Sequence, residues 1–215
     1  MVKVKRVERS DAPDIIFDFD GTIANTLPIL IEVAEQLSIT EMPLTIELVE
    51  ELRGLPAQQI LKRVGIPLRK VPALVTRGRK ELIVRLAEAK PFKGMLEVIQ
   101  ELSKSSNLYV MSSNSDQNIK QFFKTYGFDQ YFQAIYGNVS LFGKTKGMKK
   151  IIKLENLDKS RVIYVGDETR DIEAAHKIKI KVASVTWGYN NKQILSKFKP
   201  DYMVSRPEEL LQLIK

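Results

Sequence analysis

The stretch Asp18-Phe19-Asp20-Gly21-Thr22-Ile23 indicates both the fold of this chain and the position of a candidate ligand site. The apolar residues 15–17 before it are typical of a strand that is buried on both faces, and Gly21 then turns the backbone. Because side chains alternate along a strand, Asp18 and Asp20 share one side and can face a pocket past the strand's carboxyl end, where open α/β sheets bind ligands. The two carboxylates repel each other, and Mg²⁺, which prefers oxygen ligands, offsets that repulsion. Asp and Gly are also ordinary turn residues, so this stretch taken alone is better explained by a strand that ends in a turn.

The composition is that of a globular chain in a reducing compartment. Its 215 residues, 44% of them hydrophobic, suffice for one large domain or for a core domain with a small insertion. The absence of cysteine excludes disulfides, a thiolate metal site and a cysteine nucleophile. The first residues carry mixed charges, which does not fit a signal peptide, and no apolar run approaches the length of a membrane span. We therefore expect a cytoplasmic protein.

The net charge of +8 raises the question of nucleic-acid binding. Lysines gather in residues 144–153 and 177–181, and a short basic run occupies residues 77–80. Lysines at such spacing usually form a solvated helix face, and the interleaved aromatic residues of a single-strand binding surface are missing. The charge therefore argues weakly for nucleic acid, and it also suits an anionic small substrate.

Residues 25–90 differ from the rest of the chain because their apolar positions recur only at helical spacing. We interpret them as a helical insertion, entered near residues 26–28, left near residues 90–91, and broken at residues 53–56. After Pro91, predicted strands and helices alternate. The strands are expected at 107–111, 134–136, 161–165, 182–187 and 202–204, and the helices at 94–102, 117–126, 146–154, 171–178 and 207–214.

Single helices between strands predict right-handed crossovers and hence an α/β fold with a doubly wound parallel sheet. The small helical insertion follows the first strand of this sheet. The predicted division is a core of residues 1–24 and 91–215 and an inserted domain of residues 25–90.

Polar residues follow three further predicted strands. Ser112-Ser113-Asn114-Ser115 precedes a helix, where one residue serves as a cap and a free hydroxyl near the helix N-terminus suits a phosphate. Lys144 follows the next strand and can reach a phosphate oxygen, although lone lysines are usually exposed. Gly166-Asp167-Glu168-Thr169-Arg170-Asp171 brings three carboxylates to a strand-to-helix turn, of which Glu168 or Asp171 alone would be ordinary first-turn acids.

This ordered set of four loops resembles the haloacid dehalogenase superfamily of phosphotransferases, over about residues 14–187. The resemblance implies that Asp18 is the nucleophile, forming an aspartyl-phosphate, and that Asp20 is the general acid and base. It implies that Ser112 holds a phosphoryl oxygen and that Lys144 balances negative charge, with Lys146 a weaker alternative. Gly21, Thr22, Ser113 and Asn114 are the further residues expected around the phosphate.

The resemblance also implies a magnesium site. Asp167 is expected to bind Mg²⁺ together with Asp18 and Asp20, the last through its backbone carbonyl. Asp171 or Glu168 is expected to orient the metal or its waters. Phosphoryl transfer needs in-line positioning and cations around the phosphoryl oxygens, which agrees with this set of residues.

Within the superfamily, the helical insertion resembles the cap of the phosphoglycolate phosphatase and β-phosphoglucomutase branch, and the second aspartate, Asp20, points to phosphate chemistry. A closing cap excludes water and implies a small phosphorylated metabolite as substrate. Arg53 and Gly54, at the break between cap helices, are candidates for substrate specificity, with a helix stop and a surface arginine as the alternative. The chain is expected to be a monomer or a homodimer.

Three other functions remain open at this point. A phosphomutase shares every core residue and passes the phosphoryl group to a sugar. A phosphonate hydrolase needs a cap lysine, for which Lys62 is the candidate. A non-catalytic module would bind anions or nucleic acid through its basic face. His176 inside a predicted helix and Trp187 near the core are interpreted as structural.

Overall fold

A six-stranded parallel sheet forms the centre of the protein, in a computed structural model that describes residues 11–40, 42–140 and 143–214. The strand order is β5-β4-β1-β6-β7-β8, and every pairing in it is parallel. The strands are β1 (Asp14–Phe17), β4 (Leu108–Met111), β5 (Phe132–Tyr136), β6 (Val162–Gly166), β7 (Lys181–Val185) and β8 (Tyr202–Val204). The first strand lies in the interior of the sheet, between β4 and β6, and the predicted α/β fold is confirmed.

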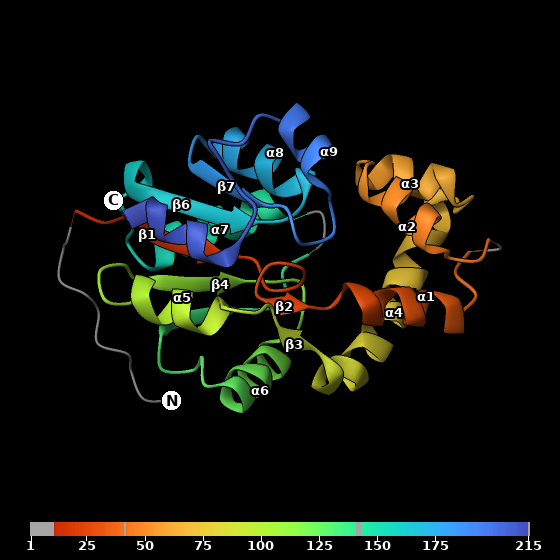
Figure 1. The fold of residues 1–215 in the computed structure, drawn as a ribbon, viewed down its shortest axis with the longest axis horizontal. Helices are drawn as coiled ribbons and strands as arrows, with labels where there is room; N and C mark the ends of the chain where they lie inside the picture. The colour runs from red at the N-terminus through yellow and green to blue at the C-terminus, as the bar shows by residue number, and fades with distance from the viewer. Residues whose placement is uncertain (1–10, 41, 141–142, 215) are drawn as a thin grey trace.

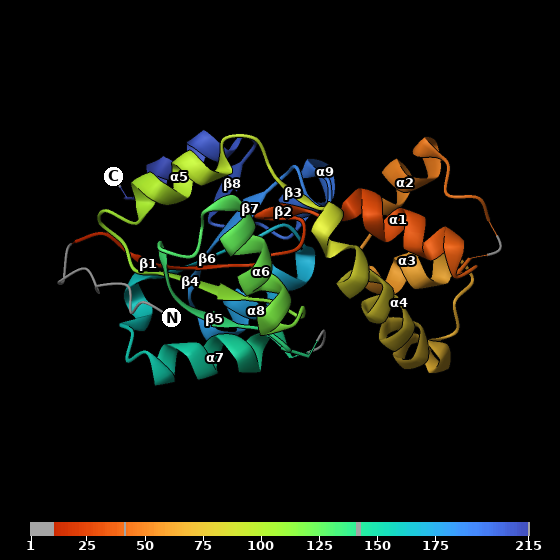
Figure 2. The same ribbon diagram turned by 90° about the horizontal axis from the view of Figure 1, so that it is seen from below.

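Helices cover both faces of the sheet (Figure 2). Ile15 and Phe17 of β1 belong to one buried cluster, and Ile16 between them belongs to the other, as the alternation of side chains along a strand requires. The first cluster contains residues of α5 (Met95–Leu102), α6 (Asp116–Tyr126) and the 3₁₀ segment η4 (Pro207–Ile214). The second contains residues of α7 (Lys144–Leu154), α8 (Thr169–Ile178) and α9 (Lys192–Lys197). The short 3₁₀ turn η3 (Lys159–Arg161) leads into β6.

The inserted helices stand beside the end of the sheet toward which the strands point (Figure 1). They are α1 (Leu27–Gln36), α2 (Ile46–Arg53), α3 (Ala57–Arg63) and α4 (Val71–Arg85), with the 3₁₀ turns η1 (Leu68–Lys70) and η2 (Leu86–Glu88). We call residues 27–88 the cap. Its entry and exit pair with each other as the antiparallel strands β2 (Ala24–Asn25) and β3 (Lys90–Pro91). A two-residue strand is too short to show an alternation of apolar and polar residues, so the sequence did not predict β2 and β3. The predicted division into domains stays a prediction.

Element boundaries differ slightly from those expected. Helix α7 begins at Lys144 instead of residue 146, so Lys144 lies in its first turn. Strand β7 ends at Val185, and the segment predicted as its continuation to residue 187 is already a loop. The closing helix is a run of 3₁₀ turns.

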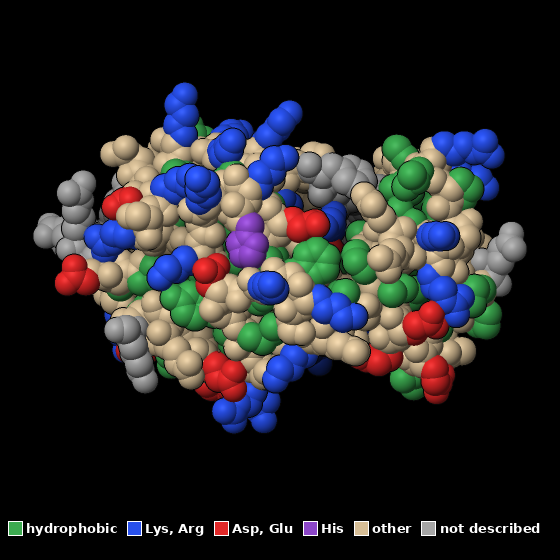
Figure 3. Space-filling model, turned by 90° about the horizontal axis from the view of Figure 1, so that it is seen from above, with side chains coloured by type: hydrophobic (Ala, Val, Ile, Leu, Met, Phe, Trp, Pro, Cys, Tyr) green, Lys and Arg blue, Asp and Glu red, His purple; other side chains and the backbone are tan. Residues whose placement is uncertain are grey.

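Most of the lysines noted in the sequence lie on the surface. Figure 3 shows lysine and arginine side chains on one face scattered among acidic and neutral ones. His176 has a 44% exposed side chain, with Nε2 3.9 Å from an oxygen of Asp201, and its structural role stays a prediction. In the described part of the chain, no helix combines the length and apolar character needed to cross a membrane.

Candidate active site

An ion pair between Asp18 and Lys144 lies at the carboxyl end of β1. Lys144 Nζ donates to Asp18 Oδ2 at 2.6 Å, and the two side chains are 11% and 8% exposed. The same ammonium group pairs with Asp171 and lies 3.5 Å from Glu168 Oε1. Burial acts to lower the pKa of Lys144, but the charges of Asp171, Asp18 and Glu168 outweigh it and raise the pKa. Lys144 is therefore a permanent cation inside an acidic site.

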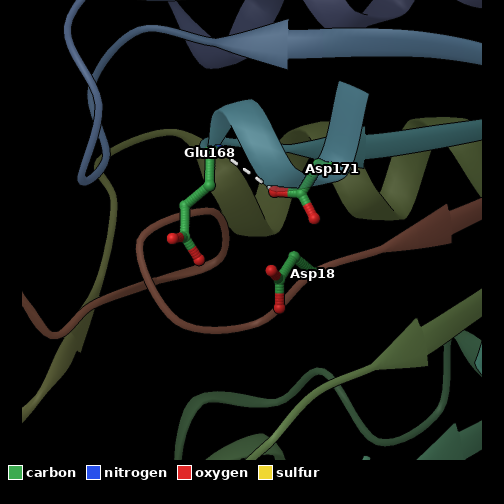
Figure 4. Close-up of side chains that lie close together, drawn as sticks. All are labelled: Asp18, Glu168 and Asp171. Atoms are coloured by element: carbon green, nitrogen blue, oxygen red, sulfur yellow. Dashed lines mark hydrogen bonds between the residues drawn. The ribbon is translucent and has the colours of Figure 1, made fainter. Parts of the chain in front are cut away.

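Three carboxylates gather around that cation. Asp18, Glu168 and Asp171 each offer an oxygen, and these oxygens lie within 4.8 Å of one another (Figure 4). The first turn of α8 orients two of them, because the Glu168 backbone N–H donates to Asp171 Oδ2 at 3.0 Å. Burial raises the pKa of Asp18, and it raises the pKa of Asp171 to about 6, even though Lys144 opposes both shifts. The Lys144 and Arg170 charges lower the pKa of Glu168 against the effect of its own burial.

Asp167 lies beside this cluster and is completely buried. Thr22 Oγ1 donates to its Oδ1 at 3.0 Å, and the Tyr189 backbone N–H donates to its Oδ2 at 2.6 Å. The backbones of Gly21 and Gly188 press against the same carboxylate, where a Cβ at either position would overlap Oδ2. Burial, reinforced by the charges of Glu168 and Asp18, raises the pKa of Asp167 well above its usual range. The lack of a side chain at Gly21 lets the loop after β1 approach Asp167 this closely.

Asp20 faces the loop that follows β4. Ser112 Oγ donates to Asp20 Oδ2 at 3.2 Å and accepts a hydrogen bond from the Asn114 backbone N–H at 2.9 Å. Burial raises the pKa of Asp20, although hydrogen bonds from Ser112, Thr26 and Asn114 side chains oppose the shift. A carboxyl group with a raised pKa holds its proton more readily, as a general acid requires. Ser113, predicted beside the phosphate, follows Ser112 in the same loop and is partly exposed.

Arg53 and Gly54 lie where the cap meets the core. Arg53 Nη2 donates to the carbonyl oxygen of Gly188 at 3.0 Å, and Nη1 pairs with Glu50 at 2.8 Å. Gly54 is the C-cap of α2, and a Cβ at this position would lie 3.4 Å from Asn191 Nδ2. The structure thus ties the partly exposed Arg53 guanidinium to a core loop, and the predicted helix stop lies at this residue. A role in substrate specificity stays a prediction.

With this geometry described, comparisons with known proteins identify the family. The model of the haloacid dehalogenase-like hydrolase family matches residues 15–185. The chain belongs to this family. A phosphoglycolate phosphatase from Synechococcus elongatus is 32% identical over 203 residues, which cover 93% of this chain and 96% of that protein. The pyrophosphatase PpaX from Listeria monocytogenes is 24% identical over 221 residues, 94% of this chain and 95% of that protein.

Solved structures agree with the fold of this haloacid dehalogenase-like hydrolase. A haloacid dehalogenase-like family protein from Streptococcus pneumoniae superposes with a TM-score of 0.77 at 21% identity, over 96% of this chain and 100% of that one. The resemblance inferred from the motifs is confirmed, and so is the prediction of a phosphatase enzyme.

The acidic residues of this hydrolase fit a divalent metal ion by the chemistry of their donors. Asp18, Glu168 and Asp171 present hard oxygen ligands within reach of one another, and Asp167 lies next to them. Burial raises the pKa of three of the four groups, which means that it destabilises their ionised forms. A bound cation would stabilise those ionised forms. All three members of this trio are among the residues predicted around the metal. Asp167 lies outside the trio, and the Asp20 side chain, which was not the predicted ligand atom, faces Ser112.

One segment that contacts the candidate site was missed in the sequence. Residues 187–191 follow β7, and Tyr189 touches Asp167 through its backbone and Thr26 through its hydroxyl, at 2.7 Å. Trp187 was expected to be a packing residue, and its ring does lie 6.0 Å from that of Phe92, while its Nε1 donates to the Thr22 carbonyl. The sequence could have indicated this segment, because it is a polar loop after a parallel strand. Such a loop lies at the same edge of the sheet as the polar loops after β1, β4 and β6.

Proposed function

We propose that this protein hydrolyses small phosphate monoesters through a covalent phosphoryl group on Asp18. The observation that carries the proposal is the buried Lys144 ammonium 2.6 Å from Asp18 Oδ2, within a cluster of further carboxylates. A carboxylate beside a fixed cation can meet a phosphate dianion, which a bare carboxylate would repel. The matching family model and the phosphatase relatives support the same reaction class.

In the first step, an oxygen of Asp18 attacks phosphorus and the bond between phosphorus and the leaving oxygen breaks. Asp20 donates its proton to that leaving oxygen, for which its raised pKa suits it. Ser112 and Lys144 hold the phosphoryl oxygens, with the backbone of Gly21, Thr22, Ser113 and Asn114 around them.

In the second step, Asp20 takes a proton from water and the water oxygen attacks the phosphorus atom. The bond between phosphorus and Asp18 breaks, which returns the free carboxylate and releases inorganic phosphate. The same group serves as acid and then as base, so its protonation state is restored after each turnover.

Asp18, Asp167, Asp171 and Glu168 would hold the divalent cation, with the Asp20 backbone carbonyl as a further oxygen ligand. When bound, Mg²⁺ would supply positive charge that reduces the repulsion between substrate and carboxylates. Carboxylate and carbonyl oxygens suit hard divalent cations such as Mg²⁺.

A phosphoglycolate-like metabolite is the substrate that we propose. The Synechococcus elongatus relative is a phosphoglycolate phosphatase, and the cap beside the site favours a small molecule over a polymer. The phosphomutase and the basic binding module are not favoured, because the relatives are phosphatases.

The test is turnover of p-nitrophenyl phosphate with Mg²⁺, comparing the wild type with Asp18→Asn. We expect the variant to lose about 10⁴-fold or more in kcat, because the group that attacks phosphorus is removed. Asp129→Asn, an exposed site, is the matched control and should keep full activity. Wild-type turnover that is absent, or that survives Asp18→Asn, would refute the proposal. Supplying phosphoglycolate and a sugar phosphate and measuring free phosphate against isomer formation then separates hydrolase from mutase.

A further inference from the structure

The side chain of Asn190 joins a helix end of the cap to a helix end of the core. Its Nδ2 donates to the carbonyl oxygens of Arg53 and Leu55, both at 3.1 Å, and its Oδ1 accepts from the Thr169 backbone N–H at 3.0 Å. Arg53 ends α2 and Thr169 begins α8, and helix ends leave such groups without intrahelical partners. One amide, only 4% exposed, therefore uses both of its donor hydrogens on the cap and its oxygen on the core.

Neighbouring residues reinforce the cap side of this contact. The Asn191 backbone N–H donates to the Arg53 carbonyl at 2.9 Å, and the Arg53 guanidinium reaches back to the Gly188 carbonyl at 3.0 Å. Tyr189 Oη shares a 2.7 Å hydrogen bond with Thr26 Oγ1, at the entry to the cap. The loop after β7 thus holds the cap at its entry and at the turn between α2 and α3.

The same loop contacts the acidic side of the active site. The Asn190 backbone N–H donates to the Asp167 carbonyl at 3.2 Å, and the Tyr189 N–H donates to the Asp167 carboxylate at 2.6 Å. Thr169, the partner of Asn190 Oδ1, lies in the first turn of α8 between Glu168 and Asp171. A shift of Asn190 would therefore move the turn that positions both carboxylates.

We propose that Asn190 is a positioning residue that couples docking of the cap turn, residues 53–56, to the geometry of the acidic turn at the start of α8. When the cap turn leaves, the Asn190 amide loses both of its carbonyl acceptors, and the side chain can turn toward the water that replaces them. That movement releases Thr169 and loosens the site. The consequence for turnover rests on the proposed phosphatase activity, whereas the docking itself does not.

Asn190→Asp isolates the cap half of this link. The carboxylate keeps an acceptor for the Thr169 N–H, but it has no hydrogen to donate and faces two carbonyl oxygens. Asn191→Asp is the matched control. It adds the same charge one residue away, keeps the backbone donor to Arg53, and keeps an acceptor for the Ile194 N–H that caps α9.

The experiment measures hydrogen exchange of cap residues 46–63 and turnover of p-nitrophenyl phosphate with Mg²⁺ in the 215-residue protein. For Asn190→Asp we expect exchange about tenfold faster, and kcat about tenfold lower with KM changed less than about twofold, since this small probe needs few cap contacts. Asn191→Asp should behave as the wild type in both measurements. Arg53→Met removes the hydrogen bond that the cap donates to the Gly188 carbonyl, and it should also accelerate exchange of the cap. This variant tests the docking contact if Asn190→Asp does not fold.

Two outcomes would overturn the proposal. Cap exchange in Asn190→Asp and Arg53→Met that equals the wild type would show that these bonds do not hold the cap. Faster exchange with unchanged kcat would show that docking and the acidic turn are independent. A wild type inactive toward p-nitrophenyl phosphate and phosphoglycolate would instead count against the proposed function, and the exchange comparison would still decide whether Asn190 holds the cap.

Discussion

Lys144 Nζ lies 2.6 Å from Asp18 Oδ2, although 126 positions separate the two residues in the sequence. Asp18 comes from the end of a central strand and Lys144 from the first turn of a helix that covers one face of the sheet. Both side chains are largely buried, so salt screens their attraction little. Breaking the pair is therefore expected to lower stability as well as the proposed phosphate binding.

Replacing Lys144 with Met should damage both properties. Removing one partner of a buried ion pair leaves uncompensated charge, and we expect the free energy of unfolding to fall by about 3 kcal/mol at neutral pH without metal. Turnover of p-nitrophenyl phosphate should fall by about 10²-fold or more, because a cation that faces the phosphoryl group is lost. Urea unfolding and steady-state kinetics measure the two effects. Lys146→Met, an exposed lysine on the same helix, is the control. Equal losses in both variants would contradict a special place for Lys144.

Much of the candidate site could be predicted from the sequence, because a single rule about parallel sheets says where the loops after the strands meet. Parallel strands end at the same edge of a sheet, so the polar residues after β1, β4 and β6 had to come together, and the structure does bring Asp18 near Asp171. Docking of the cap could not be predicted in the same way. The carbonyl groups at the end of α2 find their donors in Asn190 and Asn191, more than a hundred residues later, and no local pattern records such a pairing. Strands β2 and β3 were missed because two residues show no periodicity.

Adding Mg²⁺ to the metal-free protein should raise its melting temperature. A ligand at 100 times its Kd stabilises the folded state by about 2.7 kcal/mol, and crowded buried carboxylates are relieved by the added positive charge. Asp167→Asn should lose most of this stabilisation, whereas Asp129→Asn should keep it. Differential scanning calorimetry with and without EDTA measures the shift. A wild-type melting temperature that does not respond to Mg²⁺ would contradict the metal site.

The stability of the metal-free protein should depend on pH through Asp171. Burial raises the pKa of this carboxyl from 3.8 to about 6, so the folded state binds its proton more tightly than the unfolded state does. The resulting stabilisation is complete below about pH 3.8 and is lost as the pH rises through about 6. Asp171→Asn lacks this titration, so its melting temperature relative to the wild type should rise between pH 4 and pH 7 in EDTA. A difference that stays constant or falls over that range would contradict the direction of the shift.

Gly21→Ala should disable the site through Asp167, and Gly127→Ala provides a matched comparison. Both glycines have left-handed backbones, with φ of +74° and +77°, so each substitution carries a similar conformational cost of about 1 kcal/mol. A Cβ at Gly127 meets nothing within 4 Å, whereas a Cβ at Gly21 overlaps the Asp167 carboxylate and must displace it. Both variants should lose a similar, modest part of the free energy of unfolding, because alanine disfavours the left-handed backbone. Gly21→Ala alone should lose more, because its Cβ displaces Asp167. Only Gly21→Ala should also lose the Mg²⁺-dependent rise in melting temperature and most of the turnover of p-nitrophenyl phosphate. If Gly21→Ala kept its response to Mg²⁺, the close approach of this loop to Asp167 would have no part in holding the metal.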